Sequence, residues 1–470
     1  MRPGDDVSRR STPDGSGAGG GRIRRGSQLG GVAAKHAARV AAATATARFM
    51  SSEGADAARD RNVLKLADDV VSVVGGMRGA AHKLGQVLAV LDLGISTRAT
   101  REEFKRRLEP LFAATPPWND AAMMRVLDQS LGDRRADIAE LDGPIASASI
   151  GQVYRGTLSD GRDVAVKIKY PNVDMMVRAD MKNLKMLARV LTRYVPAANV
   201  NELVAEVARQ ITLELDFVAE GATQTMFADR YAGHPAFRIP RPIAELCTDR
   251  VLVTEFVDGL SFDEACRLDR PDRDLIGEIV YRFYCGEMYR TGTFSGDPHP
   301  GNMIILPDRT VAFLDFGLSI SLTPAELAIE QEVFGSLLAG DHERTYELVR
   351  RAGFIVEPET LDAERFAAYA MASVGWHVEP GEVTITDGVA RRAAMAAVSP
   401  NGGYVGSMGR QTLVEGHGFG RRNELATCSL LGRLRSTAPW SSIASENLGL
   451  SGPATPLGRE IARWASGDTG

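Results

Sequence analysis

The chain lacks long hydrophobic runs and has few cysteines, and both absences restrict what it can be. No run of about 18 apolar residues occurs, so we expect no transmembrane helix. The four cysteines are scattered without metal-ligand spacing, which makes a zinc site or a disulfide scaffold unexpected. A net charge of -5 gives no overall bias towards nucleic acid. The first residues form no apolar signal region, so the expected location is the cytoplasm.

The beginning of the chain has an unusual composition. Residues 1 to about 30 are rich in Gly, Ser, Arg and Pro, which is typical of a disordered tail. An Ala-rich stretch, "VAAKHAARVAAATATARFM", then predicts a helix. Every formal charge between Ser16 and Ser52 is positive, so an anionic membrane surface could attract this segment and hold the protein peripherally. A solvated basic tail is the more common outcome for such a charge run, and both interpretations stay open.

Hydrophobic periodicity indicates an α+β protein. Apolar residues spaced at threes and fours predict helices over 56–131. Around 144–170 the pattern predicts two strands joined by a turn at Asp160-Gly161. A long helical stretch at about 200–231 and a β segment at 250–259 follow. From 273 the chain reads as mainly helical, interrupted by the hairpin-like "MIILPDRTVAFLDFG".

These patterns divide the chain into a tail, a helical segment, a β-rich lobe, a helical lobe and a loose C-terminal tail. The expected bounds are 1–50, 51–140, 141–258, 259–440 and 441–470.

The segment "GDPHPGN" (296–302) combines an Asp and an Asn with two prolines and two glycines, which predicts a stiff loop. Asn302 stands five residues after Asp297, and Asp315, in "LDFG", stands eighteen after it. These offsets match a protein-kinase-like catalytic loop and its DFG turn. Phosphoryl transfer needs an acceptor-orienting base and oxygen ligands for Mg²⁺. Asp297 is the predicted base, and Asn302 and Asp315 are the predicted metal ligands.

A lysine strand and a phosphate-covering loop are expected upstream of such a site. "VAVK" ends at Lys167 within the predicted hairpin. The stretch before it keeps the last Gly and the Val of the G-x-G-x-x-G-x-V pattern, at Gly151 and Val153. Alanines Ala146 and Ala148 replace the first two glycines. Alanine adopts positive φ only at a cost, so this loop should lie differently over the phosphates.

The lysine needs a carboxylate partner, and "LELDFVAEGATQ" offers Glu214, Asp216 and Glu220. Asp216 and Glu220 are four residues apart and would share a helix face, where like charges repel unless a cation lies between them. Glu214 and Asp216 would point in roughly opposite directions unless the helix is distorted. A solvated acidic helix face is the alternative.

Taken together, these motifs resemble the UbiB/AarF/ADCK family of atypical kinases. "KLGQ" at 83–86 is similar to the family's KxGQ motif, and "ASASIGQVY" at 146–154 to its Ala-rich loop. "VAVKIKYP", the "ELD" of its ExD motif, "DPHPGN" and "LDFG" complete the resemblance over about residues 60–440. Ser147 stands where many members have a third alanine, and Ser295-Gly296 stands where many have His-Ala.

The resemblance implies a protein-kinase-like two-lobed fold with an N-terminal helical extension packed over the active site. It implies ATP or ADP with Mg²⁺ as cofactors, ATPase activity, and a role in isoprenoid-quinone or lipid metabolism without phosphorylation of proteins in trans. A lipid or quinone-precursor ligand and quinone-pathway enzymes are the implied partners. Glu220 is implied to pair with Lys167. The implied lid residues are Lys83, Gln86, Glu214 and Asp216, and the implied nucleotide contacts are Ala146, Ala148, Ser149, Gly151, Val153, Lys167 and Glu255.

The segment after the DFG turn is short. Pro324 is well placed to begin a helix capped by Thr323, which leaves about six residues after Gly317 for an activation segment. A peptide-docking platform needs more, so a protein-substrate kinase is disfavoured. Three functions remain: an ATP-hydrolysing kinase-like enzyme, a phosphotransferase for a lipid or small molecule, and a nucleotide-binding scaffold without turnover. The complete set of base and metal residues favours an enzyme.

Overall fold

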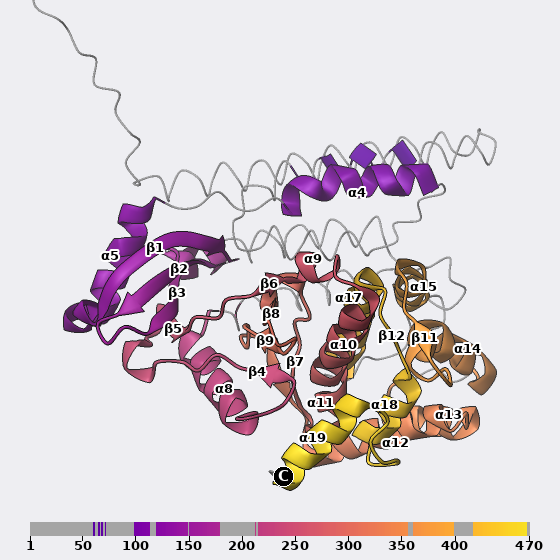
Figure 1. The fold of residues 1–470 in the computed structure, drawn as a ribbon. Helices are drawn as coiled ribbons and strands as arrows, with labels where there is room; N and C mark the ends of the chain where they lie inside the picture. The colour runs from indigo at the N-terminus through magenta and orange to yellow at the C-terminus, as the bar shows by residue number, and fades with distance from the viewer. Residues whose placement is uncertain are drawn as a thin grey trace, which may run out of the picture.

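The structure is a computed structural model with two lobes (Figure 1). In its described part, no helix is long and apolar enough to cross a membrane. The predicted residues Lys83, Gln86, Ser149 and Glu214 lie outside that part. The described residues are 98–112, 119–148, 150–178, 215–355, 361–398 and 417–467, with Thr212 and isolated positions between 60 and 71.

The first lobe is built on a four-stranded antiparallel sheet in the order β1-β2-β3-β5. The predicted hairpin is confirmed, and its turn contains Gly161 at φ 87. The two predicted strands are β2 and β3, and β1, which precedes them in the sheet, was not predicted. In chain order, the elements from α4 to β5 are α4 (Arg98–Phe112), α5 (Asp120–Leu131), a 3-10 helix (Gly132–Asp137), β1 (Ile138–Ser147), β2 (Gly151–Leu158), β3 (Asp163–Lys169), α8 (Phe217–Arg230), β4 (Phe237–Arg238), a 3-10 helix (Ala244–Leu246) and β5 (Val251–Glu255).

α8 begins later than the continuous helix predicted over 200–231. Its N-cap is Asp216, whose carboxylate accepts a hydrogen bond from the Ala219 amide at 2.9 Å. Asp216 therefore lies at the very start of α8, and Glu220 lies in its first turn. An N-cap has non-helical backbone angles, and its side chain satisfies a free amide of the first turn. This arrangement directs the Asp216 carboxylate back to the helix end.

The second lobe surrounds a long central helix in which a π-helical turn separates α10 from α11. Beside it lies a small sheet in the order β4-β9-β8-β6, whose central hairpin is the one predicted before "LDFG". The first elements of the second lobe are β6 (Leu260–Ser261), α9 (Phe262–Ala265), α10 (Arg270–Tyr281), the π turn (Arg282–Gly286), α11 (Glu287–Thr291), β7 (Thr293–Ser295), a 3-10 helix (Pro300–Asn302), β8 (Met303–Ile305), β9 (Val311–Phe313) and β10 (Ser319–Ser321).

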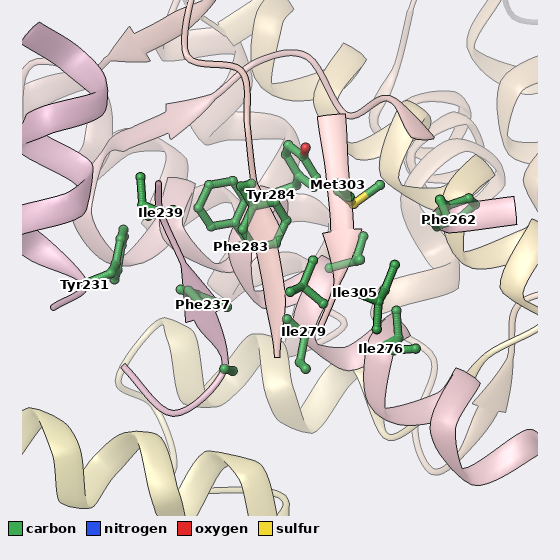
Figure 2. Close-up of a cluster of buried hydrophobic side chains, with 14 of the residues drawn as sticks. Tyr231, Phe237, Ile239, Phe262, Ile276, Ile279, Phe283, Tyr284, Met303 and Ile305 are labelled. Carbon is green, nitrogen blue, oxygen red and sulfur yellow. The ribbon is translucent and has the colours of Figure 1, made fainter. Parts of the chain in front are cut away.

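A large hydrophobic cluster joins α8 and β4 to the second lobe. Figure 2 shows Phe237 of β4, Phe283 of the π turn and Ile305 of β8 converging on it. Phe283 stacks on Phe313 with ring centroids 3.6 Å apart, and Phe316 of "LDFG" packs against Phe227 of α8 at 4.9 Å. This core fixes the DFG turn against both the central helix and α8.

The remaining helices follow in the helical lobe, and α12 begins at Pro324 with Thr323 as its N-cap, as predicted. α17 lies within the region from 273 that was predicted to be mainly helical. These elements are α12 (Pro324–Leu338), α13 (His342–Arg351), α14 (Ala363–Val374), a 3-10 helix (Gly375–His377), β11 (Val383–Thr384), α15 (Asp387–Val398), α17 (His417–Leu434), β12 (Thr437–Ala438), α18 (Trp440–Asn447) and α19 (Pro456–Ser466).

The prediction of a loose tail over 441–470 is wrong, because α18 and α19 occupy most of it. Trp440 and Ile443 of α18 are fully buried. Arg282 of the π turn, itself 3% exposed, pairs with Glu446 at 2.9 Å and donates a hydrogen bond to Thr455. Thr455 in turn caps α19. A buried ion pair and a hydrophobic anchor hold this segment to the central helix, and neither has a local sequence signature.

Candidate active site

Lys167 and Glu220 form the ion pair that the resemblance implies. Lys167 lies on β3, where the alternate residues Val164, Val166 and Ile168 are buried in the core of the lobe. The strand's period of two therefore places Lys167 on the opposite face, towards α8. Its Nζ donates a hydrogen bond to Glu220 Oε1 at 2.7 Å. The side chains are 18% and 2% exposed, so the pair is largely shielded from water.

Asp315 faces the same lysine from the second lobe. Its Oδ2 lies 3.8 Å from Lys167 Nζ, and its Oδ1 accepts a hydrogen bond from the Gly317 amide at 3.0 Å. The burial of Phe316 holds the turn in this orientation. Lys167 therefore lies between one carboxylate of each lobe, as a phosphate-binding lysine does in a kinase-like site.

The loop "GDPHPGN" is braced by its own side chains. Asn302 Nδ2 donates to the Asp297 carbonyl oxygen at 3.1 Å and to its Oδ2 at 3.3 Å. His299 Nδ1 accepts a hydrogen bond from the Gly301 amide at 3.1 Å, so this histidine orients the backbone. The Gly296 amide bonds to the Leu318 carbonyl at 2.7 Å and ties the loop to β10. An Asp and an Asn five residues apart on a stiff turn thus fix each other's position.

The donor chemistry around Asp315 fits Mg²⁺. With its amide nitrogen turned to Asp297, Asn302 has its amide oxygen left for a metal. Asp315 is 29% exposed and supplies carboxylate oxygens. Mg²⁺ prefers such hard oxygen ligands and is usually bound by one or two carboxylates together with substrate phosphates. Asp315 and Asn302 are the residues that would hold it.

The Ala-rich turn is closely packed against β3. The Ala148 amide bonds to the Gly151 carbonyl at 2.8 Å, and the Tyr170 hydroxyl donates to the Ala148 carbonyl at 3.2 Å. A Cβ on Gly151 would lie 2.4 Å from the Ile168 carbonyl oxygen, so only glycine fits there. The glycine that the sequence keeps is thus required by the close approach of two strands.

A comparison with protein families matches residues 110–349 to the ABC1 atypical kinase-like domain. This chain belongs to that family. Curated relatives of this chain are named COQ8B, AarF domain-containing protein kinase 1 and ACTIVITY OF BC1 COMPLEX KINASE 8. These names belong to the UbiB/ADCK family that the motifs led us to expect.

Two curated relatives and one solved structure show the extent of the likeness. Atypical kinase COQ8B, mitochondrial, from Rattus norvegicus is 30% identical over 299 residues, which is 63% of this chain and 56% of that protein. AarF domain-containing protein kinase 1 from Gallus gallus is 28% identical over 361 residues, which is 74% of this chain and 68% of that protein. The structure of Rv3197–erythromycin from Mycobacterium tuberculosis has a TM-score of 0.59 and 27% identity, covering 83% of this chain and 97% of that chain.

The chain therefore spans between about half and two thirds of the length of these two curated relatives. Its kinase-like fold of mixed helix and sheet is shown by the family match and by the solved structure. An ABC1 kinase-like fold implies in general terms a site for ATP and Mg²⁺.

Within this ABC1 fold, Glu255 has a different side-chain environment from that expected of a nucleotide contact. Its carboxylate accepts hydrogen bonds from Arg238 at 2.7 Å and from the Arg241 amide at 3.1 Å. The side chain is thereby engaged at the protein surface. A role of Glu255 in nucleotide binding stays a prediction.

Sequence reasoning missed two cations of the ABC1 site. Lys169 follows Lys167 on the same face of β3, is 4% exposed, and donates a hydrogen bond to the Leu215 carbonyl before α8. Burial lowers the pKa of this lysine. The strand's alternation could have indicated it. Arg422 of α17 lies 3.8 Å from Asp297, and no local pattern links two residues so far apart in the sequence.

The lid interpretation stays a prediction. Lys83, Gln86 and Glu214 lie outside the described residues, as does Ser149 of the Ala-rich turn. Asp216, the remaining predicted lid residue, is described only as the N-cap of α8.

Proposed function

We propose that this protein is an ATP-binding, kinase-like enzyme with Mg²⁺-dependent ATPase or phosphotransfer activity that supports isoprenoid-quinone or lipid metabolism. The observation that carries the proposal is the position of Lys167 between Glu220 and Asp315. A buried lysine held by one carboxylate and facing a second is the arrangement that positions nucleotide phosphates beside a metal ligand.

The sequence-predicted polar residues of the site divide the work of this mechanism among them. Lys167, oriented by Glu220, binds the phosphates of the nucleotide. Asp315 and Asn302 would hold Mg²⁺, which neutralises phosphate charge when bound. Asp297, braced by Asn302, is positioned to accept the proton of an attacking hydroxyl or water.

The short connection after the DFG turn supports a small acceptor. β10 pairs with β7 directly after the turn, and α12 begins at Pro324 with a capping box between Thr323 and Glu326. The six residues from Leu318 to Thr323 are thus taken up by a strand and a cap. This geometry offers little backbone for docking an extended peptide. A lipid or small-molecule phosphotransferase is therefore the second candidate, and a nucleotide-binding scaffold without turnover is the third.

The quinone assignment rests on family membership. A quinone precursor or another isoprenoid lipid is the proposed ligand, and quinone-pathway enzymes are proposed partners. A peripheral membrane contact through the basic N-terminal segment would give access to such a ligand.

The test compares ADP release from ATP with and without candidate isoprenoid lipids. We expect Asp297→Asn to lower the turnover rate by roughly 10²- to 10⁴-fold, the usual contribution of a positioned base. Its ADP affinity should fall much less than its rate. Asp308→Asn, at the exposed turn between β8 and β9, is the control and should keep the wild-type rate.

Lipid-stimulated ADP release without a phosphorylated product supports the ATPase, whereas a phosphorylated lipid supports the phosphotransferase. An unchanged rate in Asp297→Asn, or an equal loss of rate and affinity, contradicts the role of Asp297 as the base.

A further inference from the structure

The loop that carries the proposed base has no positive charge of its own. "GDPHPGN" contains no lysine or arginine. A cation beside Asp297 comes from α17, where Arg422 Nη2 lies 3.8 Å from Asp297 Oδ1. This separation exceeds hydrogen-bond length. The two groups therefore attract each other across a gap rather than forming a closed bidentate pair.

The guanidinium of Arg422 keeps unused hydrogen-bonding capacity. Its side chain is 37% exposed. Within the described residues, its buried Nη1 makes no hydrogen bond. A buried donor without a partner is costly, more so when it carries charge. An anion bound at the exposed nitrogens of the guanidinium would compensate its charge and so offset part of this cost.

The backbone on both sides of Arg422 is firmly anchored. Arg421 pairs with Glu424 at 2.9 Å and with Glu330 at 3.0 Å. On the other side Asn423, which is fully buried, donates its Nδ2 hydrogen bond to the Tyr284 carbonyl in the π turn. These contacts hold this part of α17 at a fixed place on the central helix.

The π turn connects this anchor to the catalytic residues. Its wide hydrogen bond runs from the Glu287 amide to the Arg282 carbonyl, five residues apart. Burial and the charges of Asp297 and Asp315 raise the pKa of the Tyr284 hydroxyl in the same turn. Tyr284 therefore accepts the Asn423 hydrogen bond through its backbone carbonyl, and its hydroxyl lies within electrostatic range of both aspartates. π turns of this kind are frequent at functional sites.

The charge distribution indicates what Arg422 binds. Lys167 is already engaged by Glu220 and faces Asp315 on the other side of the site. A phosphoryl group that leaves the nucleotide towards an acceptor at Asp297 spreads its charge over three oxygens. Arginine, with its planar fork of donors, matches phosphate geometry better than a point charge does.

We propose that Arg422 is an anion-binding residue on the acceptor side of Asp297, with a phosphate group as its ligand. The proposal rests on the proposed kinase-like function. The phosphate has two possible sources with the same chemistry: the terminal phosphate of ATP, and a phosphate carried by the acceptor.

The experiment measures three affinities by calorimetry: Mg²⁺–ADP, Mg²⁺–AMP-PNP, and inorganic phosphate added to the Mg²⁺–ADP complex. The variants are Arg422→Gln and Arg422→Lys. Arg433→Gln is the matched control, because Arg433 lies on the same helix and pairs with the exposed Asp263. We expect Arg422→Gln to bind AMP-PNP or phosphate roughly 10- to 100-fold more weakly, the effect of losing a charged hydrogen-bond partner. Mg²⁺–ADP affinity and the melting temperature should match the control, and Arg422→Lys should recover part of the affinity.

A loss confined to AMP-PNP identifies the terminal phosphate of ATP, and a loss confined to inorganic phosphate identifies a phosphate on the acceptor. Unchanged affinities for both, or an equal loss that includes ADP, overturn the proposal. If the wild-type protein bound no Mg²⁺-nucleotide, the proposed function would fail. Phosphate titration of the nucleotide-free protein would then decide the anion site, which is overturned if binding is absent or the same in Arg422→Gln.

Discussion

Replacement of Glu220 by glutamine removes one charge from the centre of the site and keeps the side-chain shape. Glu220 is 2% exposed and accepts a hydrogen bond from Lys167 at 2.7 Å. It also stands in the first turn of α8, where the helix dipole favours a negative charge. In Glu220→Gln, Asp315 at 3.8 Å remains a charged neighbour of Lys167.

The expected cost follows from the burial of the two partners. Breaking a fully buried ion pair typically costs about 3–5 kcal/mol. Here Lys167 is 18% exposed, and the glutamine oxygen still accepts its hydrogen bond. We therefore expect the free energy of unfolding to fall by about 1.5–3 kcal/mol, the range for a hydrogen bond to a charged group. Asp163→Asn on the same sheet is the control, because its 2.6 Å pair with Arg155 is 43% and 46% exposed. It should lose less than about 1 kcal/mol.

The same substitution should weaken nucleotide binding. Lys167 is drawn towards Asp315 once Glu220 is neutral, and this contact competes with the phosphates and with the metal. We expect a loss of Mg²⁺–ADP affinity of about tenfold, or about 1.4 kcal/mol. Urea unfolding gives the stability and calorimetry gives the affinity. Equal destabilisation in Glu220→Gln and Asp163→Asn, or unchanged Mg²⁺–ADP affinity, would refute the reasoning.

Two further substitutions test the Ala-rich turn and a buried histidine. Ala148→Gly should change the ratio of ADP to ATP dissociation constants or permit autophosphorylation, because glycine allows backbone angles closed to alanine; no change in either measurement would leave the alanine with a packing role. His234 Nδ1 accepts hydrogen bonds from the Ala236 and Phe237 amides, and burial lowers the pKa of this histidine to about 3. Its neutral form therefore stabilises the fold above the unfolded-state pKa of about 6.5, and this contribution is lost as pH falls towards 3. Urea unfolding should show wild type losing up to about 2 kcal/mol relative to His234→Asn between pH 6.5 and pH 5; a pH-independent difference contradicts this.

Features of the site that depend on short-range spacing could be predicted from the sequence. The turn at Asp160-Gly161 and the start of α12 at Pro324 follow from local backbone preferences and are confirmed. The facing positions of Lys167 and Glu220 were implied by the family resemblance, and the structure brings the two together. The hydrogen bonds between Asp297 and Asn302 follow from their place on one stiff loop.

Features that depend on tertiary contacts were not predictable. The sequence pattern predicts one helical stretch over 200–231, but Asp216 is the N-cap of α8, which begins at Phe217. The tail expected over 441–470 contains helices because Trp440 is fully buried in the core and Arg282 pairs with Glu446. Arg422 reaches Asp297 only because α17 packs on the π turn. Periodicity carries no information on such long-range partners.

The central claim is that Asp315 holds a magnesium–nucleotide complex beside Lys167. The most direct test is calorimetric titration of ADP, with and without Mg²⁺, into wild type and Asp315→Asn. The asparagine oxygen can still accept the Gly317 amide hydrogen bond, so the DFG turn should keep its fold. The account predicts Mg²⁺-dependent binding in wild type and its near-complete loss in a variant with wild-type melting temperature. Equal Mg²⁺–ADP binding by the folded variant, or binding by wild type that ignores Mg²⁺, would contradict the claim.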